Sequence, residues 1–224
     1  MRQRFACILL ALALPVLGYG QSVAAAASTP VIVVEFSNPA LSPSHWVLTL
    51  HPGGKAHFRS EAGRIDPAEA GKIHTSGIDR DIELSAAFAA SVFETAGRHS
   101  YFNESCESHL KVAFQGTKTL SYAGPAGKGS CSFNYSRDRE IQALGDSFLG
   151  VAETVIEGGR LETLLQHDPL GLDKEMAALS DAAESGRALQ LCAIRPILDR
   201  LAQDERVLDI VRKRARALLA QAGI

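Results

Sequence analysis

Residues 46–60 read Trp-Val-Leu-Thr-Leu-His-Pro-Gly-Gly-Lys-Ala-His-Phe-Arg-Ser, and this stretch decides the fold class. Two strand-like runs flank Pro52-Gly53-Gly54, a combination that is typical of a tight turn. In the second run, Ala56 and Phe58 alternate with polar residues, as they do in a strand with one buried face. The stretch therefore predicts a β-hairpin, and with it an antiparallel sheet.

The length of the turn predicts which side chains face one another. A three-residue loop over 53–55 sets Leu50 opposite Phe58 on the face toward the core. Because strand side chains alternate, the same register sets His51 opposite His57 on the outer face. Two such imidazoles form a candidate surface or metal pair, but a structural zinc site needs four ligands and a catalytic one needs three and a water. Two exposed histidines on the solvated face are the alternative, and no metal is expected.

The rest of the chain up to about residue 136 is also typical of strands, with one helix. Apolar and β-branched residues predict a buried strand at 31–36 and a further strand at 78–84. Ser85 is a suitable N-cap for a helix that ends at Gly97. A second hairpin is expected from the alternating residues at 110–114, a turn at 115–117 and a return strand through 120–122.

From about residue 138 the apolar period becomes helical. Five apolar residues step by three and four positions along one helix face at 138–157: Ile141, Leu144, Phe148, Val151 and Val155. Gly158-Gly159 is expected to end or bend this helix. Three more helices are expected at 172–184, 187–202 and 205–221. The predicted fold is therefore α+β, with a β-rich part at 28–136 and an all-helical part at 137–224. The helical part either packs on the sheet within one domain or forms a separate bundle.

The last two of these helices carry a family pattern. The run Ile194-Arg-Pro-Ile-Leu-Asp-Arg-Leu201, then Asp204, then Val211-Arg212 with Ala215 and Leu218, resembles one HEAT-repeat helix pair. That resemblance implies a surface for binding other proteins, since the family stacks such pairs into curved scaffolds. A solenoid needs about three units or more, and an amphipathic helical hairpin of no particular family has the same pattern.

The first 27 residues predict where the protein resides. Two arginines precede an uncharged apolar stretch of about 16 residues, and Ala24 and Ala27 both fit the small-x-small rule for cleavage. A membrane-spanning helix needs about 20 apolar residues, and Pro15 interrupts this stretch. The pattern predicts a signal peptide over 1–27 that is removed, with a periplasmic or secreted mature chain and no stable membrane span. The alanine-rich composition is typical of bacterial proteins.

Three cysteines remain after such a cleavage. Export exposes them to an oxidising compartment, where disulfides persist. Cys106 and Cys131 lie on either side of the expected second hairpin, so a disulfide between them is predicted. The alternative is a Cys106 nucleophile with His99, Glu104 or His109 nearby. Cys192 lies in an apolar helical run and is expected to be a buried free thiol.

Charge argues against two classes of partner. The full chain has a net charge of −2, from 23 basic and 25 acidic residues. Removing residues 1–27 takes away two arginines and no acid, so the charge of the mature chain becomes −4. A mildly acidic protein has no general attraction to nucleic acid or anionic lipid. No nucleic acid partner is expected.

The sequence has no Gly-x-Ser-x-Gly motif, no His-Glu-x-x-His motif, no phosphate loop and no dinucleotide fingerprint. We therefore expect a non-catalytic binding or interaction protein, without a cofactor, whose partner is a protein or small ligand outside the cytoplasm. The alternative is a small extracytoplasmic hydrolase or metal-dependent enzyme. Its site would be a pocket that joins two or more of five scattered residues: His51, His57, His99, Glu104 and His109.

Overall fold

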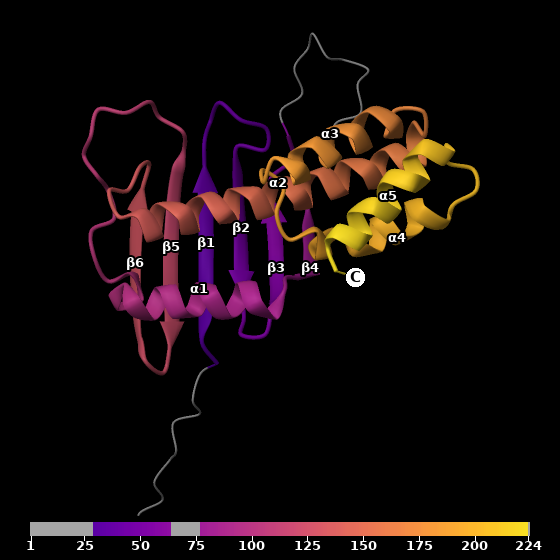
Figure 1. The fold of residues 1–224 in the computed structure, drawn as a ribbon. Coiled ribbons are helices and arrows are strands. Elements are labelled where there is room, and N and C mark those ends of the chain that lie inside the picture. The colour runs from indigo at the N-terminus through magenta and orange to yellow at the C-terminus, as the bar shows by residue number, and fades with distance from the viewer. Residues whose placement is uncertain (1–28, 64–76, 224) are drawn as a thin grey trace, which may run out of the picture.

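The structure is a computed structural model that describes residues 29–63 and 77–223. A six-stranded antiparallel sheet forms its N-terminal part, and several helices follow it in the chain (Figure 1). This arrangement confirms the predicted α+β class. The predicted signal peptide over 1–27 lies outside the described residues, and so do residues 64–76. None of the helices within the described ranges is long and apolar enough to span a lipid bilayer.

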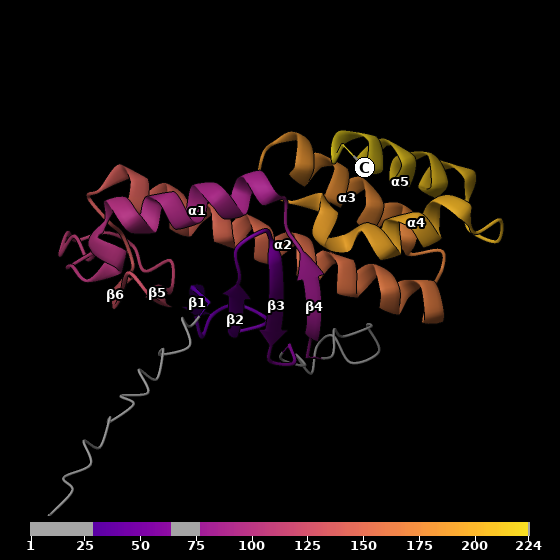
Figure 2. The same ribbon diagram turned by 90° about the horizontal axis from the view of Figure 1, so that it is seen from below.

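The strands lie in the order β4-β3-β2-β1-β5-β6, so β4 and β6 are the two edges. Their bounds are β1 Val31–Ser37, β2 His45–Leu50, β3 Lys55–Ser60, β4 Asp79–Glu83, β5 Thr117–Gly124 and β6 Gly127–Phe133. Two helices, α1 (Ala86–Arg98) and α2 (Arg139–His167), cross the same face of the sheet (Figures 1 and 2). Among the described residues, no helix lies on the opposite face of the sheet (Figure 2).

This one-sided cover explains the burial of β1. Ile32, Val34 and Phe36 point into the core and are at most 3% exposed, whereas Glu35 is exposed. Strand side chains alternate between faces, so a sheet covered on one side buries every second residue. The strand predicted at 31–36 is therefore confirmed, but only its alternate, core-facing residues are fully buried.

The first hairpin forms, but its predicted register is wrong by two residues. Leu50 pairs with Ala56, and Thr49 pairs with His57. The His51 N–H donates to the Lys55 carbonyl oxygen at 2.8 Å, so the loop is 52–54 rather than 53–55. Gly53 and Gly54 have φ angles of 85° and 99°, which glycine adopts easily. These angles complete the turn by Gly54, one residue before the predicted end of the loop. A slip of two residues keeps every side chain on its predicted face.

The predicted second hairpin is wrong in its first arm. Residues 110–114 form no strand, and Leu110, Val112 and Phe114 are 46%, 43% and 59% exposed. The true hairpin joins β5 to β6 through the turn between Gly124 and Gly127. Strand β5 lies between β1 and β6, so neither of its edges is free to pair with 110–114.

Helix α1 begins where its cap predicts. The Ser85 hydroxyl accepts from the Phe88 backbone N–H at 3.2 Å, and the helix continues one residue past Gly97. In the same way, an Asp138 carboxylate oxygen accepts from two N–H groups of the first turn of α2. Capping side chains satisfy the donors that a helix start leaves unpaired.

Gly158 and Gly159 do not end α2, which continues to His167, so the helix end predicted there is wrong. They lie within it because a neighbouring segment approaches closely. A Cβ atom at Gly158 would lie 2.3 Å from Cγ2 of Ile194. The helix therefore joins two cores: Ile141 and Phe148 pack with the sheet, and Leu161 packs with the later helices.

The later helices are α3 (Leu172–Glu184), α4 (Arg195–Gln203) and α5 (Asp209–Gln221), with a 3-10 turn η3 (Leu191–Ile194) before α4. The predicted helix at 172–184 is confirmed. The predicted helix at 187–202 begins later because Gln190 has a φ of 56°, outside the helical range. The predicted helix at 205–221 begins at Asp209. Helices α4 and α5 lie side by side as a pair, and α5 also packs on α3 (Figures 1 and 2).

Candidate binding cleft at the β4 edge

A cleft of about 580 Å³ lies between the β3–β4 edge of the sheet and residues 192–196, where η3 meets the start of α4. One wall comes from β3 and β4 and the other from residues 192–196, and His51 lines the end. The lining residues are His51, Lys55, Ala56, His57, Asp81, Ile82, Glu83, Cys192, Ala193, Arg195 and Pro196. A volume of this size is within the range of small-ligand sites.

His51 and His57 both line this cleft, by a geometry that differs from the predicted one. Thr49, not His51, lies directly opposite His57. His51 follows the end of β2, is exposed and lies on the same face of the hairpin as His57. The two imidazoles therefore belong to one site without being cross-strand partners.

Two carboxylates hold the His57 ring. Its Nδ1 lies 2.8 Å from Asp81 Oδ1, and its Nε2 lies 3.0 Å from Asp79 Oδ1. The hydrogen bond with Asp81 raises the pKa of His57, burial lowers it less, and the Asp79 charge raises it further. Because both ring nitrogens have acidic partners, this arrangement favours the protonated form of His57 and leaves neither nitrogen free to act as a base or a metal ligand.

Three other ionisable groups of the cleft are unpaired. Within residues 29–63 and 77–223, the side chains of His51, Lys55 and Glu83 have no hydrogen bond or ion pair. Lys55 and Glu83 occupy facing positions on β3 and β4, yet no salt bridge joins them. These side chains are available to a ligand that offers groups of either charge.

Cys192 is the free thiol of this cleft, and the sequence did not connect it to the histidines. It is half-buried, and its Sγ lies 3.7 Å from the Gln190 side-chain oxygen. Burial raises the pKa of the Cys192 thiol, and the Glu83 charge adds to the increase. A thiol with a raised pKa stays protonated at neutral pH and is a poor nucleophile.

The charge pattern of this edge was visible in the sequence but was missed. Bases stand at 55, 57 and 59 and acids at 79, 81 and 83, each with the period of a strand. Such matched patterns on two strands indicate pairing. The second wall has no comparable signal in the sequence, because residues 192–196 lie beside β4 only through long-range packing of η3 on α2 and β4. Among the described residues, no group of three or more His, Cys, Asp or Glu side chains is arranged to hold a metal ion.

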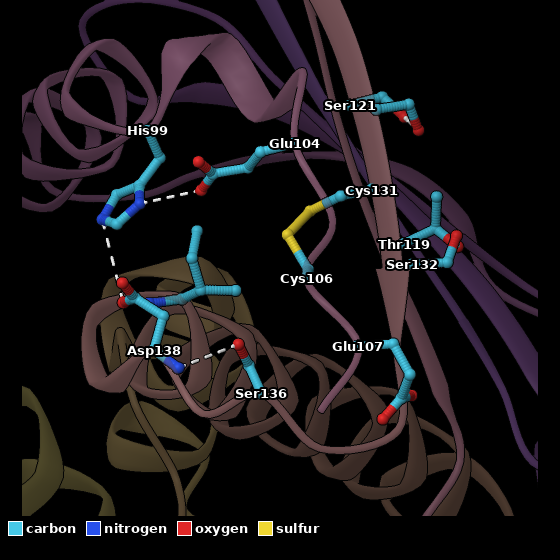
Figure 3. Close-up of a disulfide and its surroundings, with 12 residues drawn as sticks. His99, Glu104, Cys106, Glu107, Thr119, Ser121, Cys131, Ser132, Ser136 and Asp138 are labelled. Carbon is cyan, nitrogen blue, oxygen red and sulfur yellow. Dashed lines mark hydrogen bonds and ion pairs between the residues drawn. A yellow bond between two sulfur atoms is a disulfide. The ribbon is translucent and has the colours of Figure 1, made fainter. Parts of the chain in front are cut away.

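The predicted disulfide lies at the other edge of the sheet. Cys106 and Cys131 are bonded, with Cα atoms 5.6 Å apart (Figure 3). Cys131 lies on β6, whereas Cys106 belongs to the segment after the 3-10 turn η2 (Ser100–Phe102), which packs against β6. The disulfide therefore joins β6 to this covering segment rather than two arms of one hairpin. Because Cys106 is bonded, it is not a thiol nucleophile in this structure.

His99 and Glu104 also belong to this edge. His99 lies at the end of α1, with Nδ1 3.0 Å from Glu104 and Nε2 3.0 Å from Glu140 of α2. Its side chain is 13% exposed. Burial lowers the pKa of His99, but hydrogen bonds with Glu140 and Glu104 more than offset this, so the pKa is raised. Figure 3 shows His99 and Glu104 beside the disulfide.

The five scattered residues therefore do not share one pocket. His51 and His57 lie near β4, while His99 and Glu104 lie near β6. His109 is exposed, and its backbone N–H donates to Glu107. The structure places two candidate residues in one cleft and two in a separate ion-paired group.

Comparison of the chain with protein-family models, with curated proteins and with solved structures found no match.

Proposed function

We propose that this chain is an exported binding protein that holds a ligand or a segment of a partner in the cleft beside β4 and does not transform it. The observation that carries this proposal is the cleft itself, in which the His51, Lys55 and Glu83 side chains have no partner among the described residues and the walls are apolar. Ligand sites typically combine an apolar lining with a few polar groups that orient the ligand.

Export is supported by two independent features. The first 27 residues have the pattern of a signal peptide. The Cys106–Cys131 disulfide is of the kind that forms and persists outside the reducing cytosol. Together they favour a periplasmic or secreted location.

Binding without catalysis is supported by the state of the reactive groups. Nucleophilic catalysis needs a base within hydrogen-bond reach of an activated nucleophile. Both nitrogens of His57 are held by carboxylates, and the Cys192 thiol has a raised pKa. The cleft therefore offers charge and shape rather than an activated side chain.

The proposal is tested on protein recovered from the exported fraction of its host. Native mass spectrometry would report the cleavage site, the disulfide and any bound companion. We expect the companion to slow hydrogen exchange in 55–57, 81–83 and 192–196. A companion that protects only other segments contradicts the assignment of the cleft.

A matched pair of variants sharpens this test. Lys55→Met with Glu83→Gln removes two unpaired charges of the cleft and should weaken companion binding at least about tenfold, as expected when charge-assisted contacts are lost. Lys128→Met with Glu205→Gln makes the same chemical changes at exposed positions elsewhere. Equal affinity of the two double variants would contradict the proposal.

An extracytoplasmic hydrolase or metal-dependent enzyme is the second candidate. It is favoured by one observation, that His51 and His57 line the same cleft. It predicts stoichiometric metal in the native protein, or turnover of an ester or peptide substrate that His57→Gln abolishes. Native protein without metal and without turnover would remove it.

A further inference from the structure

We propose that the occupant of this cleft is an extended peptide segment with cationic side chains, which adds to β4 as a seventh strand. This inference rests on the proposed binding function of the cleft and names the chemistry of the partner. It is carried by the backbone of β4, by the position of the cleft and by the charges of β3 and β4.

The outer edge of β4 has free backbone groups. The Leu84 N–H donates to Gly54 and the Ser60 N–H donates to Ile78, both at 2.8 Å, so the even-numbered residues of 78–84 bond to β3. In an antiparallel pair, the residues between them direct their N–H and C=O groups away from the neighbour. No backbone hydrogen bond to Asp81 or Glu83 on this outer side occurs in the described part of the chain.

The cleft lies along these free groups. Asp81, Ile82 and Glu83 line one side, and Cys192, Ala193 and Pro196 line the other. Edge strands are usually covered, twisted away or shortened, since unpaired N–H and C=O groups template another strand. Here the edge faces an open cleft, and about three residues of an extended peptide would match the length from Asp81 to Glu83. Strand addition is a general mode of peptide recognition.

The charges predict the sequence class of the peptide. On the open face, Lys55 faces Glu83, His57 faces Asp81 and Arg59 faces Asp79. Opposite charges stabilise facing positions of neighbouring strands, and like charges destabilise them. A strand beside this part of β4 would face two acids, Asp81 and Glu83, so it should carry lysine or arginine at the two positions opposite them.

The intervening positions of the peptide face inward. Ile82 and Ala193 are 6% and 7% exposed, so this part of the cleft is apolar. Small or β-branched apolar side chains suit it. A second copy of this chain does not, because pairing β4 with another β4 would set acids opposite acids. The expected motif is therefore cation, small apolar, cation.

The test uses synthetic peptides and the full mature chain. We expect acetyl-Lys-Val-Lys-Val-Lys-amide to bind, and the corresponding Glu-Val peptide to bind at least about tenfold more weakly, as measured by fluorescence anisotropy at low salt. N-methylation of the amides that face β4 should weaken binding about tenfold again, because it removes backbone donors. Unchanged affinity after N-methylation at every register would overturn strand addition, and equal affinity for the Glu-Val peptide would overturn the charge assignment.

Variants then place the peptide on β4. Glu83→Lys should abolish the preference for the lysine peptide, because it replaces one of the two facing acids with a cation, whereas Glu205→Lys changes an exposed acid in the α4–α5 connection and should leave the preference intact. Near-ultraviolet circular dichroism checks that each variant is folded. If Glu83→Lys does not fold, the N-methylated peptides on the unaltered chain still decide the question.

Failure of this inference is distinct from failure of the proposed function. If a native companion protects 192–196 but no lysine peptide binds, the peptide assignment falls and the binding cleft stands. If a companion protects neither 81–83 nor 192–196, both fall. A dimer in sedimentation analysis whose contacts protect 81–83 would also overturn the peptide assignment, because a second copy would then be the occupant.

Discussion

The two edges of the sheet are treated in opposite ways. Along β6, the chain from Ser100 to Ser108 covers the outer side, the Cys106–Cys131 disulfide fastens it, and the Ser108 N–H donates to Tyr135 just past the strand. Along β4, backbone groups of Asp81 and Glu83 face a cleft. A covered edge strand cannot pair with another chain. The backbone groups of an open edge strand can, so the open β4 edge is where we expect a partner to bind.

Each edge also has a histidine between carboxylates, and the two differ in what they connect. His99 joins the end of α1, the covering segment and the start of α2, and its side chain is 13% exposed. His57 bonds to Asp79 and Asp81 on the neighbouring strand, and its side chain is 44% exposed. We infer that the first histidine fastens the fold and that the second shapes the surface of the open edge.

The largest expected effect comes from opening the covered edge. Cys131→Ser should lower the free energy of unfolding by about 3.5 kcal/mol, the chain-entropy value for a 25-residue separation. Urea unfolding followed by circular dichroism measures it. Cys192→Ser, which changes the free thiol at the other edge, is the matched control and should cost no more than about 1 kcal/mol. Equal losses in the two variants would remove the contrast between the edges.

The next effect concerns the wall that makes the open edge a cleft. In the unaltered chain, Ile194 packs directly on Gly158, and we infer that this close packing positions η3 beside β4. Gly158→Ala would place a Cβ atom only 2.3 Å from the Ile194 side chain. We expect a loss of about 1–3 kcal/mol, as in other overpacked cores, with weaker peptide binding at β4. Gly97→Ala is the control because its Cβ would meet nothing within 4 Å, and it should be neutral or stabilise by up to about 1 kcal/mol. Unchanged stability of Gly158→Ala would contradict this account of the wall.

Local patterns predicted the elements of this fold, and long-range pairing decided the rest. The Ser85 cap and the apolar steps from Ile141 to Val155 predicted α1 and the first half of α2, since capping and one-sided burial are local. Residues 110–114 have the same alternation as a strand, but β1 and β6 already occupy both edges of β5. Which segments compete to pair with a given strand cannot be determined from a short stretch of sequence.

The disulfide and the cleft show the same limit. Cys106 and Cys131 were predicted to pair because of the compartment, and the pair is present although the hairpin expected between them is not. The cleft needs residues 192–196 beside a strand more than 100 residues earlier in the chain. The alternating charges of β3 and β4 are the one feature of the sequence that indicates the pairing of these two strands.

A smaller effect, dependent on pH, is expected from the histidine of the covered edge. The pKa of His99 is raised in the folded state, so its charge stabilises the fold fully below the unfolded pKa of about 6.5. That stabilisation is lost as the pH rises through the folded pKa. His99→Gln should therefore cost about 1 kcal/mol at pH 5.5 and less at pH 8.5, measured by urea unfolding at both values. An equal cost at the two pH values would show that the His99 charge does not stabilise the fold.

The smallest effect is expected from the histidine of the open edge. The pKa of His57 is also raised, chiefly by the Asp81 hydrogen bond, so its contribution has the same sign and is likewise lost as the pH rises. Its partners are 65% and 94% exposed, and solvent screens such pairs. His57→Gln should cost only a few tenths of a kcal/mol at pH 5.5.

The same substitution removes a cation beside Asp79 and Asp81, so the affinity of the lysine peptide should rise, most clearly below pH 6.5, where His57 competes for these carboxylates. A large loss of stability with no change in peptide affinity would mean that His57 fastens the fold as His99 does, and the two edges would then differ only in the disulfide.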